Sequence, residues 1–531
     1  MKRQINYVLL LLAGLIPAFA SAFNCDDCSC RATSKTFYTI EPVFQNSSPE
    51  RLTFFRENRM MLREDGWKGA LQIVPFGGKS TKGDRLARYF MPYCLDEILV
   101  SEAQGVEGTT VLANQLNIYT ANGDFQSRVS FDPRHTFAGV GLNYVQKFYE
   151  TCAGNAWWFG ISLPIEHVKN SMNLCETVIN DGGGAITTTP DFPVVGNVTE
   201  AFQQPSWQYG RIGGGTITPA EQTTGCCNTS SSVTNNCGKM SKTGVADLEL
   251  LLGSDWLMTE CASLSSWFGL LVPTGTRVKG VQVFEPVIGH NHHWGILLGA
   301  NAGFDVWHHP CKERSIRYEL DMNWWFMFSR DEVRSFDLIN KPWSRYMQVY
   351  LSQADATAAA AAVAPYNVIQ ATPGINLFTQ QVKVKPGFQR TINSALVYTA
   401  CRLEAEVGYN LFVRESECVK LKCVFPEGAA LKSLLGAGQT DGVQIIGDNY
   451  LNVNADALIN YSQNIITAAD LDLESASSPS QFLSTFYGAL GYRMDEREYP
   501  MIFGLGGSYQ WSRDNNGMNR WMIWGKAAVS F

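Results

Sequence analysis

The sequence lacks any long apolar run after its first 22 residues. No later stretch offers about 20 consecutive apolar residues, the length that a helix needs to cross a lipid bilayer. Charged residues are also sparse, at 17% of the 531 residues, and the net charge of −7 is not the basic excess of a nucleic-acid-binding protein. These absences exclude a helical membrane protein and argue against nucleic acid as a partner.

Histidine is scarce too, which limits the chemistry that the chain supports. Five of the seven histidines fall in two clusters, at 290–293 and 308–309. The other two, His135 and His167, have no serine or aspartate context typical of a hydrolase. The run from Gly504 to Ser508 lies in an expected strand and not in a nucleophile turn. We therefore expect no enzyme, no catalytic residue and no cofactor.

The histidine clusters flank one expected strand, 294–306, so they should lie roughly 30 Å or more apart and cannot share a metal ion. Cys25, Cys28 and Cys30 could supply half of a zinc site, but no matching second pair follows. We expect no metal centre. We expect the histidines, with Trp294 and Trp307, to lie at the two membrane interfaces.

The first 22 residues have the organisation of a cleaved secretory signal. Lys2 and Arg3 form a basic head, residues 7–16 are apolar, and residues 20–22 supply small side chains for cleavage. The apolar run is too short to span a membrane. We expect residues 1–22 to be removed as the chain leaves the cytoplasm.

Alternation with a period of two dominates the rest of the chain. In 316–328, mostly aromatic apolar side chains alternate with Arg317, Glu319, Asp321 and Asn323. The same alternation marks 156–166, 402–414, 501–513 and 518–531, and more weakly 69–77, 111–120, 125–132, 137–149, 244–252, 266–274, 294–306, 340–351, 375–384, 391–400 and 482–494. A soluble β-sandwich also alternates, but its outward face would be charged. An aromatic face, with further aromatics at the strand ends, favours tilted strands that span a membrane.

The last strand carries the most specific signal. One of its faces comprises Trp521, Ile523, Gly525, Ala527, Val529 and the final Phe531. An apolar stripe that runs to a terminal phenylalanine resembles the last strand of Gram-negative outer-membrane β-barrels. The resemblance implies an all-β, transmembrane antiparallel β-barrel of about 12–16 strands in the bacterial outer membrane. It also implies that Phe531 is the signal read by the barrel assembly machinery, and that the partners include outer-membrane lipids and lipopolysaccharide.

The expected organisation has three parts: a signal peptide over 1–22, an N-terminal segment over 23–66 and a barrel over 67–531. Ser48, followed by Pro49, predicts the start of a helix over about 49–63. The segment that carries this helix is either a periplasmic arm on the barrel rim or a plug in the lumen. The polar, turn-rich stretches 168–243 and 416–480 are expected to be long extracellular loops.

The polar faces of the strands predict a wet interior. The expected pore-lining residues are Arg317, Glu319, Asp321, Arg402, Glu404, Glu406 and Arg414. Such charges either select and slow ions or form a salt-bridge layer that fills the barrel. Strand number discriminates between the two, because a barrel of about 8 strands fills with side chains and one of about 14 or more leaves an aqueous channel.

We expect a porin-like channel for passive diffusion of small hydrophilic solutes, either monomeric or as a homo-oligomer. The fourteen cysteines depart from ordinary porins, and disulfides are expected in the groups 25–30, 226–237 and 401–423. They are similar to the cysteines of the major outer-membrane proteins of chlamydia-like bacteria, where disulfides between proteins stiffen the envelope. The alternative is therefore a disulfide-cross-linked structural protein or adhesin. A third reading is a transporter of hydrophobic compounds with the N-terminal helix as plug.

Overall fold

The computed structural model describes residues 34–56, 68–102, 110–151, 155–185, 194–212, 240–259, 261–309, 313–355, 372–431, 465–495, 497–512, 514 and 516–531. The expected signal peptide and the cysteines at 25–30 and 226–237 lie outside these residues. Within the described part of the chain, no helix is both long and apolar enough to cross a membrane.

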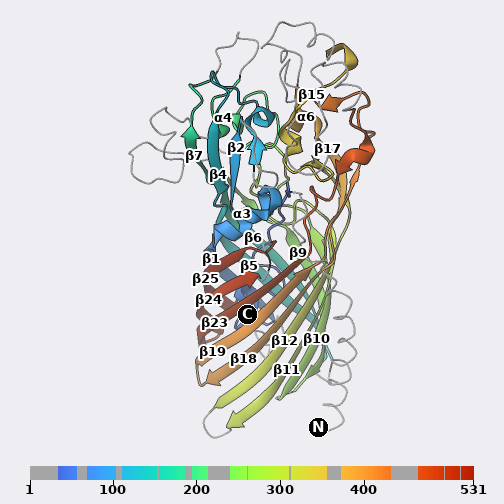
Figure 1. The fold of residues 1–531 in the computed structure, drawn as a ribbon. Helices are drawn as coiled ribbons and strands as arrows, with labels where there is room; N and C mark the ends of the chain where they lie inside the picture. Colours follow the sequence, from blue (N-terminus) through green and yellow to red (C-terminus); the bar gives the residue numbers. More distant parts are fainter. Residues whose placement is uncertain are drawn as a thin grey trace. The chain divides into compact units, whose positions relative to one another are not determined.

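Twelve antiparallel strands close into a β-barrel (Figure 1), which confirms the predicted transmembrane barrel of about 12–16 strands. The order around the barrel is β5-β1-β25-β24-β23-β19-β18-β12-β11-β10-β9-β6, and β6 pairs with β5 to close the sheet. The strands are β1 (Gly69–Thr81), β5 (Arg134–Glu150), β6 (Ala156–Ser171), β9 (Leu248–Met258), β10 (Ala262–Val272), β11 (Gly295–His309), β12 (Arg314–Met327), β18 (Gln389–Ala400), β19 (Leu403–Arg414), β23 (Gln481–Met494), β24 (Met501–Ser512) and β25 (Asn519–Ser530). A short strand, β8 (Met240–Val245), precedes β9 and pairs with residues 165–170 of β6.

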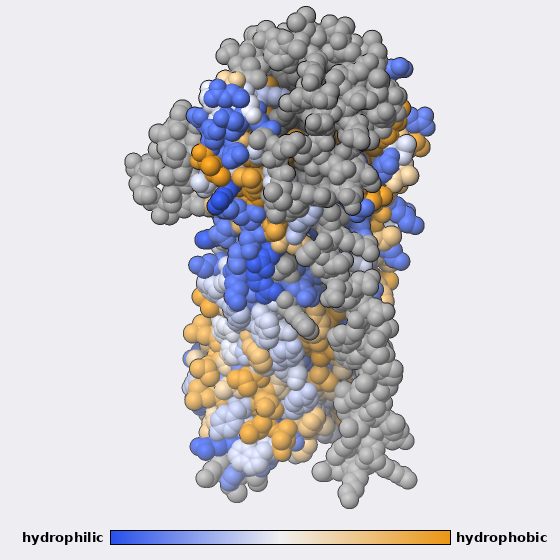
Figure 2. All heavy atoms as spheres, viewed as in Figure 1, coloured by the Kyte–Doolittle hydropathy of each residue, from blue (hydrophilic) through white to orange (hydrophobic). Residues whose placement is uncertain are grey.

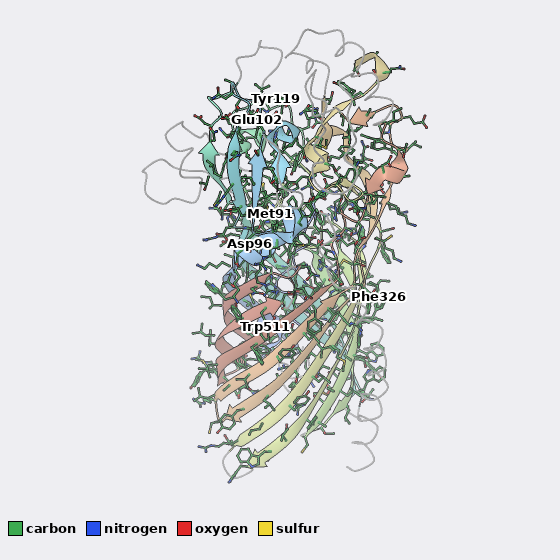
Figure 3. The ribbon with its side chains drawn as sticks, in the orientation of Figure 1. Met91, Asp96, Glu102, Tyr119, Phe326 and Trp511 are labelled. Carbon is green, nitrogen blue, oxygen red and sulfur yellow. The ribbon has the colours of Figure 1, made fainter. Side chains whose placement is uncertain are left out.

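The two faces of the barrel have opposite character. On β12, Glu319, Asp321 and Asn323 are at most 1% exposed, whereas Phe326 points outward (Figure 3) and is 45% exposed. Other exposed apolar side chains on the barrel strands include Leu403, Val407, Leu490, Leu505 and Ile523. Figure 2 shows apolar side chains gathered over the barrel. A closed sheet pairs its main-chain groups internally, and an apolar outer face suits lipid.

The connections differ between the two ends of the barrel. Short turns at one end, which we call the short-turn end, span 151–155, 259–261, 310–313, 401–402 and 495–500. At the other end, which we call the long-connection end, the long connections span 82–133, 172–247, 273–294, 328–388 and 415–480, and one short connection spans 513–518. Phe531 lies at the short-turn end, where its main chain exchanges two hydrogen bonds with Gly69, of 2.8 and 2.9 Å, and its ring lies against Tyr144. Its role as an assembly signal stays a prediction.

The long connections form four small sheets with a core of their own, which we call the loop domain. The first sheet contains β2 (Glu97–Ser101), β3 (Thr110–Leu112), β4 (Gln126–Phe131) and β7 (Leu174–Asn180), and the second β13 (Arg330–Ser335), β17 (Thr379–Lys385) and β20 (Cys418–Leu421). The others are β14 (Asp337–Leu338) with β22 (Leu471–Asp472), and β15 (Gln348–Tyr350) with β16 (Thr372–Pro373) and β21 (Ala430–Leu431). The helices α3 (Gly83–Phe90), α4 (Val198–Ala201) and α6 (Gly374–Leu377) contribute to the same core. At its centre Trp207 stacks on Tyr346, with 4.8 Å between the ring centroids.

Four predicted spanning strands fall in the loop domain, so these predictions are wrong. They are 111–120, 125–132, 340–351 and 375–384, in the connections 82–133 and 328–388. The alternation itself is real, since Val382 and Val384 of β17 are buried and Lys383 between them is exposed. A strand half-buried on a soluble core shows the same period of two as a spanning strand. The pattern alone did not separate the two surroundings.

Residues 34–56, which we call the lumen segment, run through the barrel from the long-connection end towards the short-turn end. The hydroxyl of Ser34 donates to Asp337 of the loop domain, and that of Thr39 donates to Glu417, just beyond β19. Further along, Arg56 bonds Asp321, midway along β12, and Glu406, in the half of β19 nearer the short-turn end. The segment therefore passes from contacts with the loop domain to contacts with inward-facing wall residues.

The helix in this segment is shorter than predicted. Helix α2 (Pro49–Leu52) begins after Ser48 with Pro49 in its first turn, as expected, but it ends at Leu52. Thr53 is not helical, and Phe54 has a φ of 60°, a conformation that does not continue a helix. Within the described residues, the expected helix over 49–63 is wrong beyond Leu52.

Candidate functional site: the barrel lumen

The predicted pore-lining residues lie on the inner face of the wall, with one exception. Six of the seven are at most 9% exposed: Arg317, Glu319 and Asp321 on β12, and Glu404, Glu406 and Arg414 on β19. Arg402 differs, because it lies in the turn 401–402 before β19 and its side chain is exposed. The predicted strand over 402–414 extended one residue into that turn. That these residues line a pore stays a prediction.

The first charge cluster joins the lumen segment to both β12 and β19. The guanidinium of Arg56 lies 2.9 Å from Glu406 Oε1, 3.3 Å from Asp321 Oδ2 and 3.8 Å from Glu319 Oε2. The hydroxyl of Tyr487 donates a further hydrogen bond of 3.2 Å to Glu406. One arginine of the lumen segment thus faces three carboxylates of the wall.

The second cluster is centred on Arg51, five residues before Arg56 in the lumen segment. Arg51 forms an ion pair with Glu249 of β9, and both side chains are at most 4% exposed. Asn46 donates 3.0 Å to the side chain of Asn323 on β12, and its main-chain N–H donates 3.3 Å to Glu249. The lumen segment is therefore bonded to β9 and β12, which are separated in the wall by β10 and β11.

Wall side chains also satisfy the main chain of the segment where α2 leaves carbonyls without helical partners. Lys526 of β25 donates to the oxygens of Arg51 and Thr53, and Gln72 of β1 also donates to that of Arg51. Asn410 of β19 donates 2.9 Å to the oxygen of Ser47, which precedes the helix. A short helix leaves its last carbonyls unpaired, so Lys526 and Gln72 replace missing helical bonds at its C-terminal end.

Inward-facing aromatic rings take up much of the remaining space. Trp158 lies against Gly253, where a Cβ atom would sit 2.1 Å from the ring, and Trp524 lies against Gly506, where the distance would be 2.4 Å. Both rings are at most 3% exposed. Glycine is required at these two wall positions because the ring occupies the place of a side chain.

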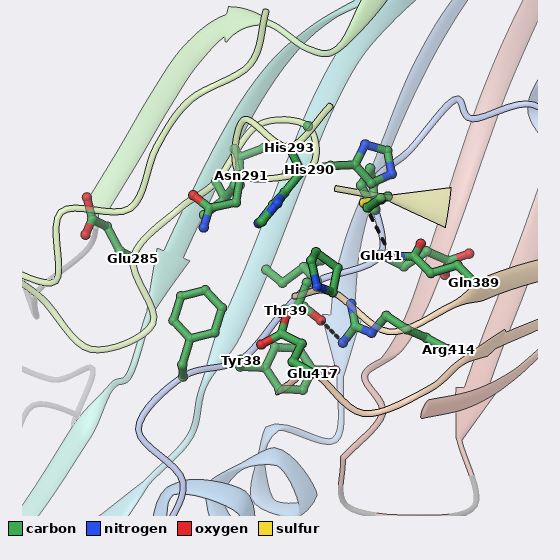
Figure 4. Close-up of a pocket in the computed structure, with 18 of the residues that line it drawn as sticks. Tyr38, Thr39, Glu41, Glu285, His290, Asn291, His293, Gln389, Arg414 and Glu417 are labelled. Atoms are coloured by element: carbon green, nitrogen blue, oxygen red, sulfur yellow. Dashed lines mark hydrogen bonds between the residues drawn. The ribbon is translucent and has the colours of Figure 1, made fainter. Parts of the chain in front are cut away.

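A cavity lies at the long-connection end, and we call it the mouth cavity (Figure 4); its empty space, open solvent at its opening included, is about 760 Å³. Residues 37–43 of the lumen segment form one wall, and the ends of β5, β6, β12, β18 and β19 contribute to the others. Its lining combines polar and charged side chains with apolar ones, among them Ile40, Phe137, Val168 and Met327. A smaller cavity of about 440 Å³ lies between residues 41–50 and the wall, with polar side chains such as Asn410 in its lining.

The histidine clusters do lie at opposite ends of β11, but one of them is not interfacial. His290 Nδ1 lies 2.9 Å from Asp247, and His293 Nε2 lies 2.7 Å from Glu332, with both imidazoles buried. Burial opposes ionisation of Glu332, but Arg334 and His293 outweigh it and hold the pKa of this carboxyl below its usual value. Among the residues that the structure describes, no three His, Cys, Asp or Glu side chains are arranged to hold a metal ion.

Sequence reasoning missed the residues of the lumen segment that contact the wall. Arg51 and Arg56 lie in a stretch expected to be mostly a helix, and they are among the most completely buried large side chains in the structure. Arg520 and Lys526 were visible as the two charged residues on the inward face of the last strand. Charges on such a face indicate buried partners, and this signal could have predicted a polar occupant of the lumen.

No family model matches this sequence, and neither does any of the curated proteins compared with it. Among solved structures, the COG4313 outer membrane channel from Pseudomonas putida F1 is 10% identical, with a TM-score of 0.34, and the match covers 87% of this chain and 95% of that chain. For the transport unit of the autotransporter AIDA-I from Escherichia coli the identity is 7%, the TM-score 0.29 and the coverage 92% and 96%. A FadL homologue from Pseudomonas aeruginosa is 9% identical, with a TM-score of 0.27 and coverage of 88% and 90%. The conclusion that this chain is a transmembrane β-barrel rests on its own strand topology and on its two faces.

Proposed function

We propose that the protein is an outer-membrane channel for passive diffusion of small hydrophilic solutes, with the lumen segment as its plug. Residues 34–56 occupy the lumen in this conformation, so passage requires that they shift or leave. The long-connection end would face the exterior and the short-turn end the periplasm, as is usual for such barrels. The observation that carries the proposal is that the segment is bonded to the wall by polar contacts.

The polar contacts between the lumen segment and the wall are more compatible with a plug that can be displaced than with a segment that fills the barrel permanently. Taking a charge out of water costs several kcal/mol per ion, so a barrel that is only to be filled is more stable with apolar side chains. Glu249, Asp321 and Glu406 would instead be hydrated if Arg51 and Arg56 moved away. The polar wall therefore supports a lumen that takes up water when the segment is displaced.

The same contacts suggest the charge preference of the open state. The lumen segment supplies Arg51 and Arg56 to the middle of the lumen, and their partners on the wall are acidic. Once the segment is displaced, Glu249, Asp321 and Glu406 lose these partners and leave the wall more negative. A negative wall attracts cations, so we expect the open channel to prefer them.

Planar-bilayer recordings of the mature protein test this proposal. We expect few openings in the wild type, and frequent steps in Arg51→Gln/Arg56→Gln and after deletion of residues 34–56. In a potassium chloride gradient, the reversal potential of these steps should have the sign of a potassium preference. Arg128→Gln changes an exposed arginine of β4, with 60% of its side chain accessible, and should conduct like the wild type.

If the double arginine variant does not fold, the deletion of residues 34–56 still tests the proposal. A difference in gel migration between the unheated and the heated protein shows whether each variant has formed its barrel. A folded deletion variant without conductance overturns the proposal. A wild type that opens as often as the deletion variant overturns the assignment of the segment as plug.

The alternative, a disulfide-cross-linked structural protein, is favoured by a different observation. Cys261 and Cys401 are exposed free cysteines in short turns at the same end of the barrel. Cys401 lies at the opposite end of β19 from Cys418, roughly 40 Å away along the strand, so the two cannot pair within one chain. A thiolate at Cys261 or Cys401 can instead attack a disulfide of a neighbouring protein, forming a mixed disulfide and releasing the other sulfur as a thiolate.

Non-reducing gels of native envelopes separate this alternative from the channel. The structural alternative predicts high-molecular-weight species that disappear with reductant and are less abundant in Cys261→Ser/Cys401→Ser. The matched control is Cys418→Ser/Cys423→Ser, which removes two exposed cysteines at the other end. If no reductant-sensitive species form, or if the control removes them equally, this alternative fails.

A further inference from the structure

Two charged side chains of the mouth cavity lack a partner of opposite charge. Glu166 of β6 is 4% exposed and forms no hydrogen bond or ion pair with any described residue. Arg414 of β19 is 1% exposed and donates to the oxygens of Thr39 and Ser478, at 3.1 and 3.4 Å, but forms no ion pair within the described chain. Its Nε atom is buried without a partner.

The strand order places these two side chains on opposite walls. Five strands separate β6 from β19 in either direction around the closed sheet. Glu166 lies in the half of β6 nearer the long-connection end, and Arg414 is the last residue of β19 at that end. Both line the mouth cavity, so a carboxylate and a guanidinium face it from opposite sides (Figure 4 shows Arg414).

The other charged groups of the cavity have bonded partners of their own. Arg334 bonds Glu332 at 2.8 Å and Glu417 at 3.2 Å. Glu41 bonds Arg520 at 2.9 Å, and Glu285 bonds Lys242 at 3.0 Å. His290 is engaged through Nδ1 with Asp247, which leaves its buried Nε2 without a partner. An uncompensated buried charge is costly, so the cavity favours an occupant that supplies both missing charges.

We propose that the mouth cavity binds a small zwitterion of the dipeptide class, with its ammonium group at Glu166 and its carboxylate at Arg414. The apolar side chains of such a ligand would lie against Ile40, Phe137 and Val168, and Gln389 Oε1, which is buried without a partner, can accept its peptide N–H. A simple cation would satisfy Glu166 alone, and a simple anion Arg414 alone. The inference concerns binding at the mouth and goes beyond the proposed channel.

Calorimetric titration of the mature protein in detergent with the dipeptide Ala-Leu tests the proposal. N-acetyl-Ala-Leu lacks the ammonium group and Ala-Leu-amide lacks the carboxylate. In the wild type each modification should weaken binding about tenfold or more, which is about 1.4 kcal/mol. Glu166→Gln should bind the acetylated and free peptides equally, and Arg414→Gln should do so for the amidated and free peptides.

Glu166→Gln is the decisive variant, because this side chain bonds nothing in the described structure and its replacement should not disturb folding. The control Glu97→Gln changes an exposed acid of β2 and should leave all three affinities as in the wild type. The proposal is overturned if the wild type does not bind Ala-Leu, or if Glu166→Gln still discriminates against the acetylated peptide. A protein that conducts as proposed above but does not bind the peptide overturns this inference alone.

Discussion

Lys526, near the end of the last strand, donates a 2.8 Å hydrogen bond to the main-chain oxygen of Arg51, although 475 residues separate them. The same amine donates to the oxygen of Thr53. The ammonium group is enclosed between the wall and the lumen segment, because Lys526 is 4% exposed. This contact ties the beginning of the described chain to the strand that closes the barrel against β1.

Lys526→Met should loosen the lumen segment without opening the barrel. It removes the donor of two hydrogen bonds to buried oxygens, each worth about 1–3 kcal/mol when a buried partner is left unpaired. We expect faster trypsin cleavage after Arg51 and Arg56, with unchanged migration of the unheated barrel on a gel. Lys79→Met, at an exposed lysine of β1, is the control. Equal cleavage rates in the two variants would contradict the role of this contact.

Gly506→Val and Gly507→Val form a matched pair on β24. A Cβ atom at Gly506 would sit 2.4 Å from the ring of Trp524 inside the barrel, whereas at Gly507 the nearest atom would be 3.5 Å away. Overpacking of this kind costs about 1–3 kcal/mol. Gly506→Val should lower the denaturant midpoint of the refolded barrel, and Gly507→Val should leave it near the wild-type value. A larger loss in Gly507→Val would show that the face assignment of β24 is wrong.

Asp472 of the loop domain should make stability depend on pH. Burial raises the pKa of Asp472 to about 6 from an ordinary value of 3.8. A carboxyl group with a raised pKa holds its proton more tightly in the folded state, so its contribution to stability is full below about pH 4 and is lost as the pH rises through 6. Asp472→Asn cannot ionise, and Asn can still accept the hydrogen bond from the Ser475 N–H.

We therefore expect Asp472→Asn to exceed the wild type in stability at pH 7.5, by about 1–2 kcal/mol after allowance for its partial exposure. The two proteins should have equal stability near pH 4. Thermal unfolding followed by the fluorescence of the buried tryptophans Trp207 and Trp343 measures this. Glu427→Gln, an exposed acid in the same connection, controls for charge alone. A variant with the same advantage at both pH values would contradict the assignment to this carboxyl.

The direction of the lumen segment predicts which side of the membrane its start can be reached from. Ser34 and Thr36 bond Asp337 and Ser335 of the loop domain, at the long-connection end. An epitope inserted directly before Ser34 should bind antibody on intact cells. The same epitope in the short turn 495–500 should bind only after the outer membrane is permeabilised. The opposite pattern would show that the proposed orientation is reversed.

Periodicity was sufficient to find every barrel strand, because one face of each strand meets lipid and the other meets the lumen. It also found strands that do not span, such as β4 and β17, because a soluble core imposes the same alternation. The distinction lies in pairing. β17 bonds β13 and β20 in a sheet of its own, whereas the wall strands pair in one closed ring. Which distant segments pair cannot be predicted from the hydrophobic periodicity of one segment.

The inward orientation of the charged residues on β12 and β19 could also be predicted from the sequence, since a charged residue that alternates with aromatics must face away from lipid. The partners of these charged residues could not be predicted. In the sequence, nothing distinguishes Arg51 and Arg56 from other residues of a polar stretch. In the folded barrel they bond Glu249 and Glu406, which lie about 200 and 350 residues later in the chain.

The order of residues along each strand thus sufficed to establish a barrel with an apolar exterior and a polar interior, because that pattern depends only on nearest neighbours. What occupies the interior, and which charges stay unpaired at its mouth, depended on contacts that arise when the sheet closes. Closure brings Glu166 and Arg414 to opposite walls of one cavity, and residues 37–43 of the lumen segment form a further wall of it.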